Sequence, residues 1–261
     1  MNGYRILAVI SRHLVPTLRD PMRLMDMFYW PLLDIVLWGF TSLWLGTLSR
    51  ENPMASTMLL SGLVMWQVVF RSSIEVTRNM LEELWHENFI NLFASPLTFW
   101  EWVVALLCIS FINSLWNLLF GASMVYLFFS VNVFSLGIYV VPFYIMLLMF
   151  GWFCGLMACS AILRLGRRVE MVAWSFPWFF STFSCVFYPL HVLPASVQKI
   201  ALLLPTTHVF ENLRRVVLLK EVDPAGLVYG AVLSCCFLLG ACTLIFYAFK
   251  GAQNRGLNSV G

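Results

Sequence analysis

The chain has 261 residues, of which 61% are apolar and 11% are charged, and its mean hydropathy is +0.83. Soluble domains are about 45 to 50% apolar and about 25% charged, so this composition excludes an ordinary soluble protein and predicts an all-α integral membrane protein. The net charge of +3 is small and scattered, which excludes a nucleic-acid-binding surface. Six membrane spans use about 120 residues, so we expect one membrane domain over 1–261 and no separate soluble catalytic domain.

The N-terminal segment, residues 1–25, predicts an amphipathic helix that lies in the membrane interface. Arg5, Arg12 and Arg19 recur every seven residues on one face, and leucines occupy much of the other. Pro16 interrupts the pattern, so a plain extension of the first span is the alternative.

Six apolar runs predict six transmembrane helices, at 27–48, 55–77, 98–129, 137–163, 169–189 and 225–249. The third run is longer than one span needs, so we expect it to tilt or protrude. With both termini in the cytoplasm, 11 of the 16 Lys and Arg residues fall on the cytoplasmic side. The positive-inside rule therefore favours two cytoplasmic termini.

The first and fifth runs carry unusual side chains for a membrane span. Asp34 is a charged group inside the first run, where it either lines a substrate path or pairs with an interfacial arginine. The fifth run is strongly aromatic, a composition that suits sugars, acyl chains and drug rings, and also ordinary bilayer interfaces. A single acid and the lack of an internal repeat argue against an ion-coupled transporter.

Two patterns predict close packing of helices. Ser110, Asn113 and Asn117 form a polar stripe on one face of the third run, which we interpret chiefly as hydrogen-bonding contacts between helices. Small residues recur four apart at Gly151 and Gly155, and again at 226 and 230, which lets helix backbones approach each other.

The segment 80–97 predicts a short amphipathic helix between two spans. Glu82, Glu83 and Glu87 lie on one side and apolar residues on the other, and the helix ends before Pro96. An acidic face suits a protein better than anionic lipid. We therefore expect this helix to dock on a partner protein.

The segment 190–224 predicts a re-entrant helical hairpin between spans five and six. Pro194 opens and Pro205 closes a helix of about ten residues, or about 15 Å, which is too short to cross the bilayer. A second helix is expected to start at Thr206 or Thr207 as N-cap. Irregular backbone at this depth requires protein or a water-filled cavity around it.

No sequence motif supports an enzyme. The chain contains no H-E-x-x-H, no G-x-S-x-G and no G-x-x-x-x-G-K-[ST], so we expect no catalytic residue, and any ATP must bind another subunit. The four histidines lack neighbours at ligand spacing, and the seven cysteines form no C-x-x-C pair, so we expect no metal site.

These features resemble the membrane subunits of type-2 ABC exporters, the permeases that move drugs, lipids and lipo-oligosaccharides outward. The resemblance covers nearly the whole chain. It rests on Glu87 and Leu92 followed by Ala-Ser-Pro at 94–96, on F-x-P-L-x-x-L-P from Phe187 to Pro194, and on L-P-x-T-H from Leu204 to His208 with a later arginine.

The resemblance implies a function and a set of sites. A homodimer of this chain would form an export path for an amphipathic lipid, glycolipid or drug across a plasma membrane, the inner membrane in a bacterium. A soluble ABC ATPase subunit would bind ATP and Mg²⁺, and this chain would hold no cofactor. The implied sites are the ATPase-coupling residues Glu83, Trp85, Glu87, Asn88, Phe89 and Leu92, and the exit residues Pro189, Pro194, Pro205, His208 and Arg214. The first and fifth spans would form the walls of the path, where we expect Asp34, Trp38, Trp178, Phe180 and Phe183. Asp34 and the aromatic residues of the fifth span depart from the family pattern, so the cargo stays open.

Two other classes of function stay open. An ion-coupled secondary transporter or channel would need an ion-sensitive charged pathway and no ATPase. A membrane-embedded enzyme would need clustered acids or histidines at the bilayer surface, where this sequence places its acids on the expected docking helix.

Overall fold

The computed structural model describes residues 1–48, 54–85, 95–166 and 169–255, and this part of the chain is all-helical. The elements are α1 (Gly3–Arg19), α2 (Pro21–Leu48), α3 (Ala55–Trp85), α5 (Phe99–Phe129), the 3-10 segment η1 (Val133–Tyr139), α6 (Val140–Leu165), α7 (Glu170–Phe183), the 3-10 turn η3 (Leu190–Val192), α8 (Ala195–Ala201), α9 (Pro205–Leu219) and α10 (Pro224–Arg255).

Four helices in the described part are long and apolar enough to cross a membrane: Ser56–Trp85, Phe99–Phe129, Val133–Leu165 and Pro224–Asn254. The protein is therefore a membrane protein. The other two predicted spans correspond to α2 and α7. Neither is among these four candidates. Helix α2 is long enough, with 28 residues, but three tryptophans and Asp34 make it less apolar, and the 14 residues of α7 rise only about 21 Å, less than the thickness of a bilayer core.

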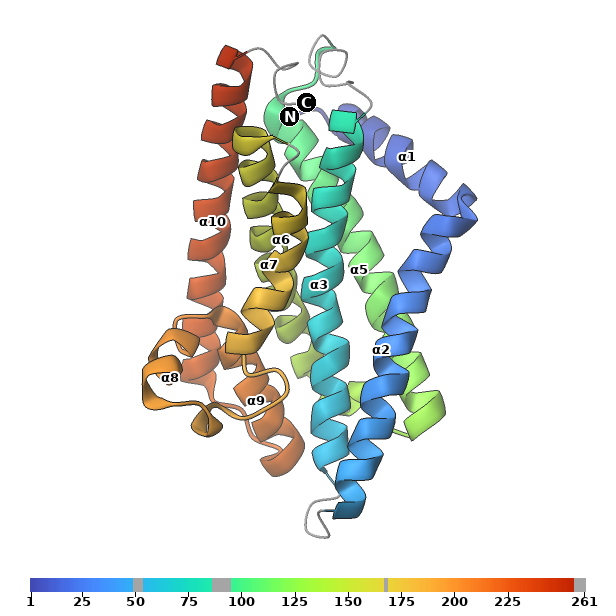
Figure 1. The fold of residues 1–261 in the computed structure, drawn as a ribbon, viewed down its shortest axis with the longest axis vertical. Helices are drawn as coiled ribbons and strands as arrows, with labels where there is room; N and C mark the ends of the chain where they lie inside the picture. The colour runs from blue at the N-terminus through green and yellow to red at the C-terminus, as the bar shows by residue number, and fades with distance from the viewer. Residues whose placement is uncertain (49–53, 86–94, 167–168, 256–261) are drawn as a thin grey trace.

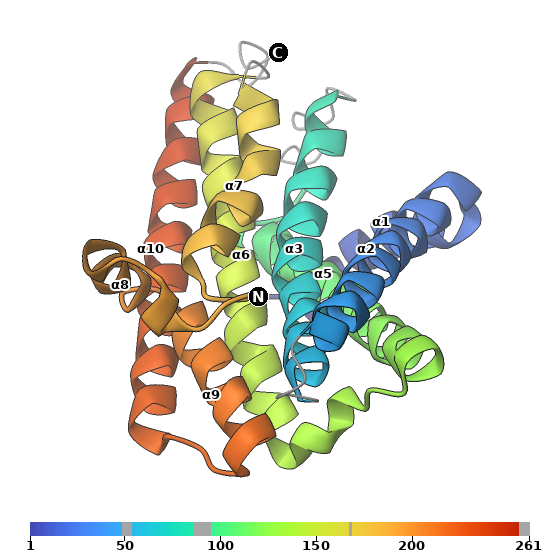
Figure 2. The same ribbon diagram turned by 60° about the horizontal axis from the view of Figure 1, so that its bottom comes forward.

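Helix α3 lies at the centre of the bundle (Figure 1). It packs against α2, α5 and α6, and α6 in turn packs against α10. Helix α1 and the last turns of α10 lie at one end of the bundle, and α8 and α9 lie toward the other (Figures 1 and 2). Both ends of the described chain are thus on the same side of the bundle.

The predicted close packing of small residues is confirmed where α6 crosses α3. A Cβ atom added at Gly151 would lie 2.8 Å from the Val69 carbonyl oxygen, and one at Gly155 would lie 2.9 Å from that of Ser73. Only glycine allows the two backbones this approach.

The predicted polar stripe on α5 is also confirmed as a set of interhelical hydrogen bonds. The Ser110 hydroxyl donates to the Ser72 carbonyl at 2.9 Å, and the Asn113 amide donates to the Glu75 carboxylate at 2.9 Å. Asn117 donates to the carbonyl of Met27 on α2 at 3.4 Å. The stripe therefore ties α5 to both α2 and α3.

Helix α3 differs from the prediction of two separate elements at 55–77 and 80–97. It continues unbroken from Ala55 to Trp85, because the sequence from 63 to 85 contains no glycine or proline to end it. Of the predicted docking helix, residues 80–85 belong to the end of α3, and 86–94 lie outside the described residues.

The expected start of the second re-entrant helix was wrong. Helix α9 begins at Pro205, with Leu204 as its N-cap, so Thr206 and Thr207 lie inside the first turn. Proline is favoured there because its missing N–H has no helical partner. The threonine hydroxyls are buried and bond to the end of α7, at 2.7 Å to Ser184 Oγ and 3.4 Å to the Phe183 carbonyl. Helix α8 also ends earlier than expected, at Ala201.

Candidate functional site

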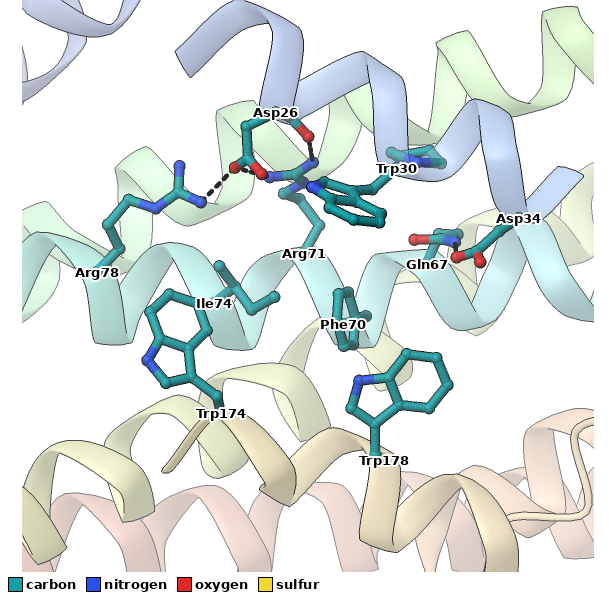
Figure 3. A pocket seen from close by; sticks show the side chains of 11 residues that line it. Asp26, Trp30, Asp34, Gln67, Phe70, Arg71, Ile74, Arg78, Trp174 and Trp178 are labelled. Carbon is teal, nitrogen blue, oxygen red and sulfur yellow. Dashed lines mark hydrogen bonds and ion pairs between the residues drawn. The ribbon is translucent and has the colours of Figure 1, made fainter. Parts of the chain in front are cut away.

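A cavity of about 410 Å³ lies between α2, α3 and α7 (Figure 3). Its walls are tryptophans and other apolar side chains, interrupted by a few charged and amide groups. The lining residues are Asp26, Trp30, Pro31, Asp34, Gln67, Phe70, Arg71, Ile74, Arg78, Trp174 and Trp178. This combination of an apolar wall with convergent polar groups is typical of a small-molecule site.

The helical repeat explains why these residues gather. On α2, Asp26, Trp30 and Asp34 are spaced four apart and share one face. On α7, Trp174 and Trp178 are also four apart, and in Figure 3 both project toward α3. Gln67, Arg71 and Arg78 form a third row, on α3. Three helices thus each contribute one row of side chains to the cavity wall.

A network of ion pairs, centred on the buried side chains of Arg71 and Glu75, lies at one end of the cavity. The Arg71 guanidinium donates to the carbonyls of Asp26 and Met27, each at 2.9 Å, and lies 3.7 Å from the carboxylates of Asp26 and Glu75. Arg78 pairs with the same two carboxylates. The network joins α2 to α3 and holds its charges in balance.

Asp34 lies apart from this network. Its carboxylate accepts a hydrogen bond from the Gln67 side-chain amide at 2.7 Å. Within the described part of the chain, no arginine or lysine lies within ion-pair distance of it. Of the two roles that the sequence left open, the structure favours lining a cavity over pairing with an arginine.

The structure brings together only some of the predicted path residues. Asp34 and Trp178 line the same cavity. Trp38 instead stacks on Phe187 with ring centroids 4.7 Å apart. Phe180 packs edge-on against Phe150 in the core, at 5.4 Å, so it supports the bundle.

Arg214, one of the predicted exit residues, binds several backbone carbonyls of the segment after α7; we call this set of contacts the Arg214 clamp. The guanidinium donates to the carbonyls of Cys185, Val186 and Tyr188, the last two at 3.2 and 2.8 Å, and pairs with Glu211 at 2.8 Å. Burial lowers the pKa of Arg214, and the Glu211 carboxylate offsets part of this effect. A guanidinium remains charged even so, and it fixes the chain after α7 against α9.

The other exit residues shape the same unit. Pro189 precedes η3, Pro194 precedes α8 and Pro205 is the first residue of α9. The His208 ring contacts the Leu202 carbonyl at 3.0 Å and packs against Tyr229 of α10. Each proline thus starts a short helical element, and His208 connects this unit to α10.

Glu83 does not lie on an open docking face, which corrects the sequence interpretation. Its carboxylate is 2% exposed, pairs with Arg12 of α1 at 3.1 Å, and lies 3.1 Å from Nε2 of His13 on the same helix. Arg23 binds Glu82 in the same way at 2.9 Å. Buried under α1, Glu83 cannot contact a soluble partner directly.

Helix α1 is a separate helix and not an extension of α2. It continues through Pro16 to Arg19, and the chain turns at Asp20 before α2 starts (Figure 1). The predicted segment 1–25 therefore includes the first residues of α2. Arg5 and Arg12 of α1 pair with Glu101 of α5 and Glu83 of α3, while Leu7 and Leu18 are exposed.

Of the remaining coupling residues, the structure describes only Trp85. Trp85 is the last residue of α3 and is exposed. Glu87, Asn88, Phe89 and Leu92 lie outside the described residues.

Sequence reasoning missed Gln67, Arg71 and Glu75 as parts of the site. Arg71 lies within α3, which continues 14 residues beyond it. The available signal was the spacing of Arg71 and Glu75, an i, i+4 pair of opposite charges within an apolar helix.

No protein-family model matches the chain, and no curated protein matches it.

Proposed function

We propose that this chain is the membrane subunit of a type-2 ABC exporter. The observation that carries the proposal is the Arg214 clamp. It joins two of the three sequence patterns on which the resemblance rests. Arg214 of α9, the helix that begins within L-P-x-T-H at 204–208, donates to the carbonyl of Tyr188, inside F-x-P-L-x-x-L-P at 187–194. The cavity between α2, α3 and α7 provides a place for a cargo molecule.

A separate soluble ATPase would supply the energy in this proposal. It binds ATP and Mg²⁺, and it docks near Trp85, Glu87, Asn88, Phe89 and Leu92. Helix α3 supports a mechanical coupling because it continues unbroken for 31 residues, about 46 Å, from Ala55 to Trp85 and carries Gln67 and Arg71 of the cavity wall. ATP binding would then favour one of two arrangements of the helices.

The working unit in this proposal contains two copies of the chain in a plasma membrane. The path runs between the two copies, along α2 and α7. Both helices carry large exposed apolar side chains, including Trp30 and Trp44 on α2 and Trp178 and Phe179 on α7. The cargo is an amphipathic lipid, glycolipid or drug, which such walls suit better than an inorganic ion.

One observation favours an ion-coupled transporter as the second candidate. The Asp26, Arg71, Glu75 and Arg78 network is a charged element inside the bundle, of the kind that ion-coupled carriers use. Its charges are mutually paired, however, which a structural role explains equally well.

Coexpression tests the proposal. The tagged chain is expressed with the protein of any adjacent reading frame that carries G-x-x-x-x-G-K-[ST], and the purified assembly is weighed by native mass spectrometry. We expect two copies of this 30.0-kDa chain with two ATPase subunits. A chain that purifies alone from every such coexpression, and still transports when the ion gradient is intact, would favour the second candidate.

A further inference from the structure

The charges that line the cavity do not cancel at every point. Asp26 and Glu75 balance Arg71 and Arg78 within one network. Asp34 lies eight residues from Asp26, about 12 Å along α2, and its partner Gln67 is neutral. Among the described residues, Asp34 is therefore the one acidic group of the cavity without a cationic partner.

The arginines of the cavity are already paired, so they are not available to neutralise the charge of an anionic ligand. Arg71 is 4% exposed and is held by two backbone carbonyls and two carboxylates. An anionic head group near Asp34 would add a second negative charge to a largely apolar space, which is costly.

Two tryptophans line the same cavity as Asp34. Trp30 lies one turn before Asp34 on α2, and Trp178 projects from α7 toward α3, edge-on to Phe70 at 5.3 Å (Figure 3). A cation within about 6 Å of a tryptophan face is attracted by the ring electrons. The volume of about 410 Å³ is within the range of small-molecule sites.

The geometry points to a site for an amphipathic cation, with Asp34 as the counter-ion of its charged group and Trp30 and Trp178 as the walls around its apolar part. This inference rests on the proposed function, because it names the cargo class of the same cavity. It selects organic cations over neutral glycolipids and anionic lipids.

A probe pair of equal shape and opposite charge tests the inference. The full chain, with its ATPase where one copurifies, is placed in nanodiscs, and binding of tetraphenylphosphonium, tetraphenylborate and neutral triphenylphosphine oxide is measured against empty nanodiscs. The variants are Asp34→Asn, which removes the charge at nearly constant shape, Asp34→Glu, which keeps it, and Glu221→Gln as a control at an exposed acid outside the cavity.

We expect saturable binding of the cation only. Asp34→Asn should weaken it at least tenfold, while Asp34→Glu and Glu221→Gln keep it within about threefold of the parent protein. Size-exclusion profiles establish that each variant is folded. Equal binding of cation and anion, or unchanged cation binding by folded Asp34→Asn, would overturn the inference.

Failure of the inference and failure of the proposed function are distinguishable. The binding measurement does not require ATP. An assembly with an ATPase but without cation binding removes the cargo class alone, and Asp34-dependent binding by a chain without any ATPase removes the exporter assignment alone.

Discussion

Replacing Gly155 by alanine tests the close crossing of α3 and α6, on which the geometry of the bundle depends. The added Cβ would lie 2.8 Å from the Val76 Cβ and 2.9 Å from the Ser73 carbonyl oxygen. Both atoms are fixed to the α3 backbone, so no side-chain rotation relieves the contact. Gly240 of α10 is the matched control, because nothing lies within 4 Å of a Cβ added there.

Both substitutions raise helix propensity, but only one of them also creates a steric overlap. Alanine in place of a helical glycine stabilises by about 0.5 to 1 kcal/mol at either position. Overpacking costs about 1 to 3 kcal/mol, and only Gly155→Ala incurs it. The free energy of unfolding of Gly155→Ala should therefore fall about 1 to 3 kcal/mol below that of Gly240→Ala.

Unfolding of the purified variants in one detergent, followed by tryptophan fluorescence, measures this difference. We expect the midpoint of Gly240→Ala to be at or above that of the parent protein, and the midpoint of Gly155→Ala to be lower. Equal midpoints for the two variants would refute the close crossing of α3 and α6.

Three further predictions follow from the contacts at the two ends of the bundle. Arg214→Ala should destabilise the protein by about 3 kcal/mol, because it leaves buried carbonyls unpaired. In the same unfolding measurement, the exposed Arg215→Ala should cost under about 1 kcal/mol, and similar losses for the two variants would contradict the Arg214 contacts. Arg12→Gln and Glu83→Gln should be non-additive in a double-mutant cycle by about 1 kcal/mol or more, and strict additivity would mean that the pair does not form. The stretch 191–220 is expected on the non-cytoplasmic side, so single cysteines at Lys199 and Lys220, in an otherwise cysteine-free chain, should react with an impermeant thiol reagent from outside intact cells. Labelling only after lysis would reverse this topology.

The sequence predicted contacts that one helix specifies by its own repeat. Ser110, Asn113 and Asn117 share a face by spacing alone, so their role between helices follows without knowledge of the neighbours. Gly155 was predictable for the same reason, since a small residue four positions from another marks a place of close approach.

Contacts between distant segments were not predictable in this way. Glu82 and Glu83 were correctly placed on a helix, but the helical period does not say what covers them. Arg12, which covers Glu83, lies 71 residues earlier in the chain. The cavity posed the same difficulty, because its walls come from three helices and each repeat defines only one wall.

The central proposal is that a separate ATPase drives this chain, and ATP hydrolysis in nanodiscs tests it most directly. A nanodisc encloses no compartment, so no ion gradient contributes to the measurement. We expect a soluble protein that carries G-x-x-x-x-G-K-[ST], from an adjacent reading frame, to hydrolyse ATP at a different rate when this chain is present in the disc. Substitution of its phosphate-loop lysine should abolish the activity. The same rate with and without the chain would contradict the proposal.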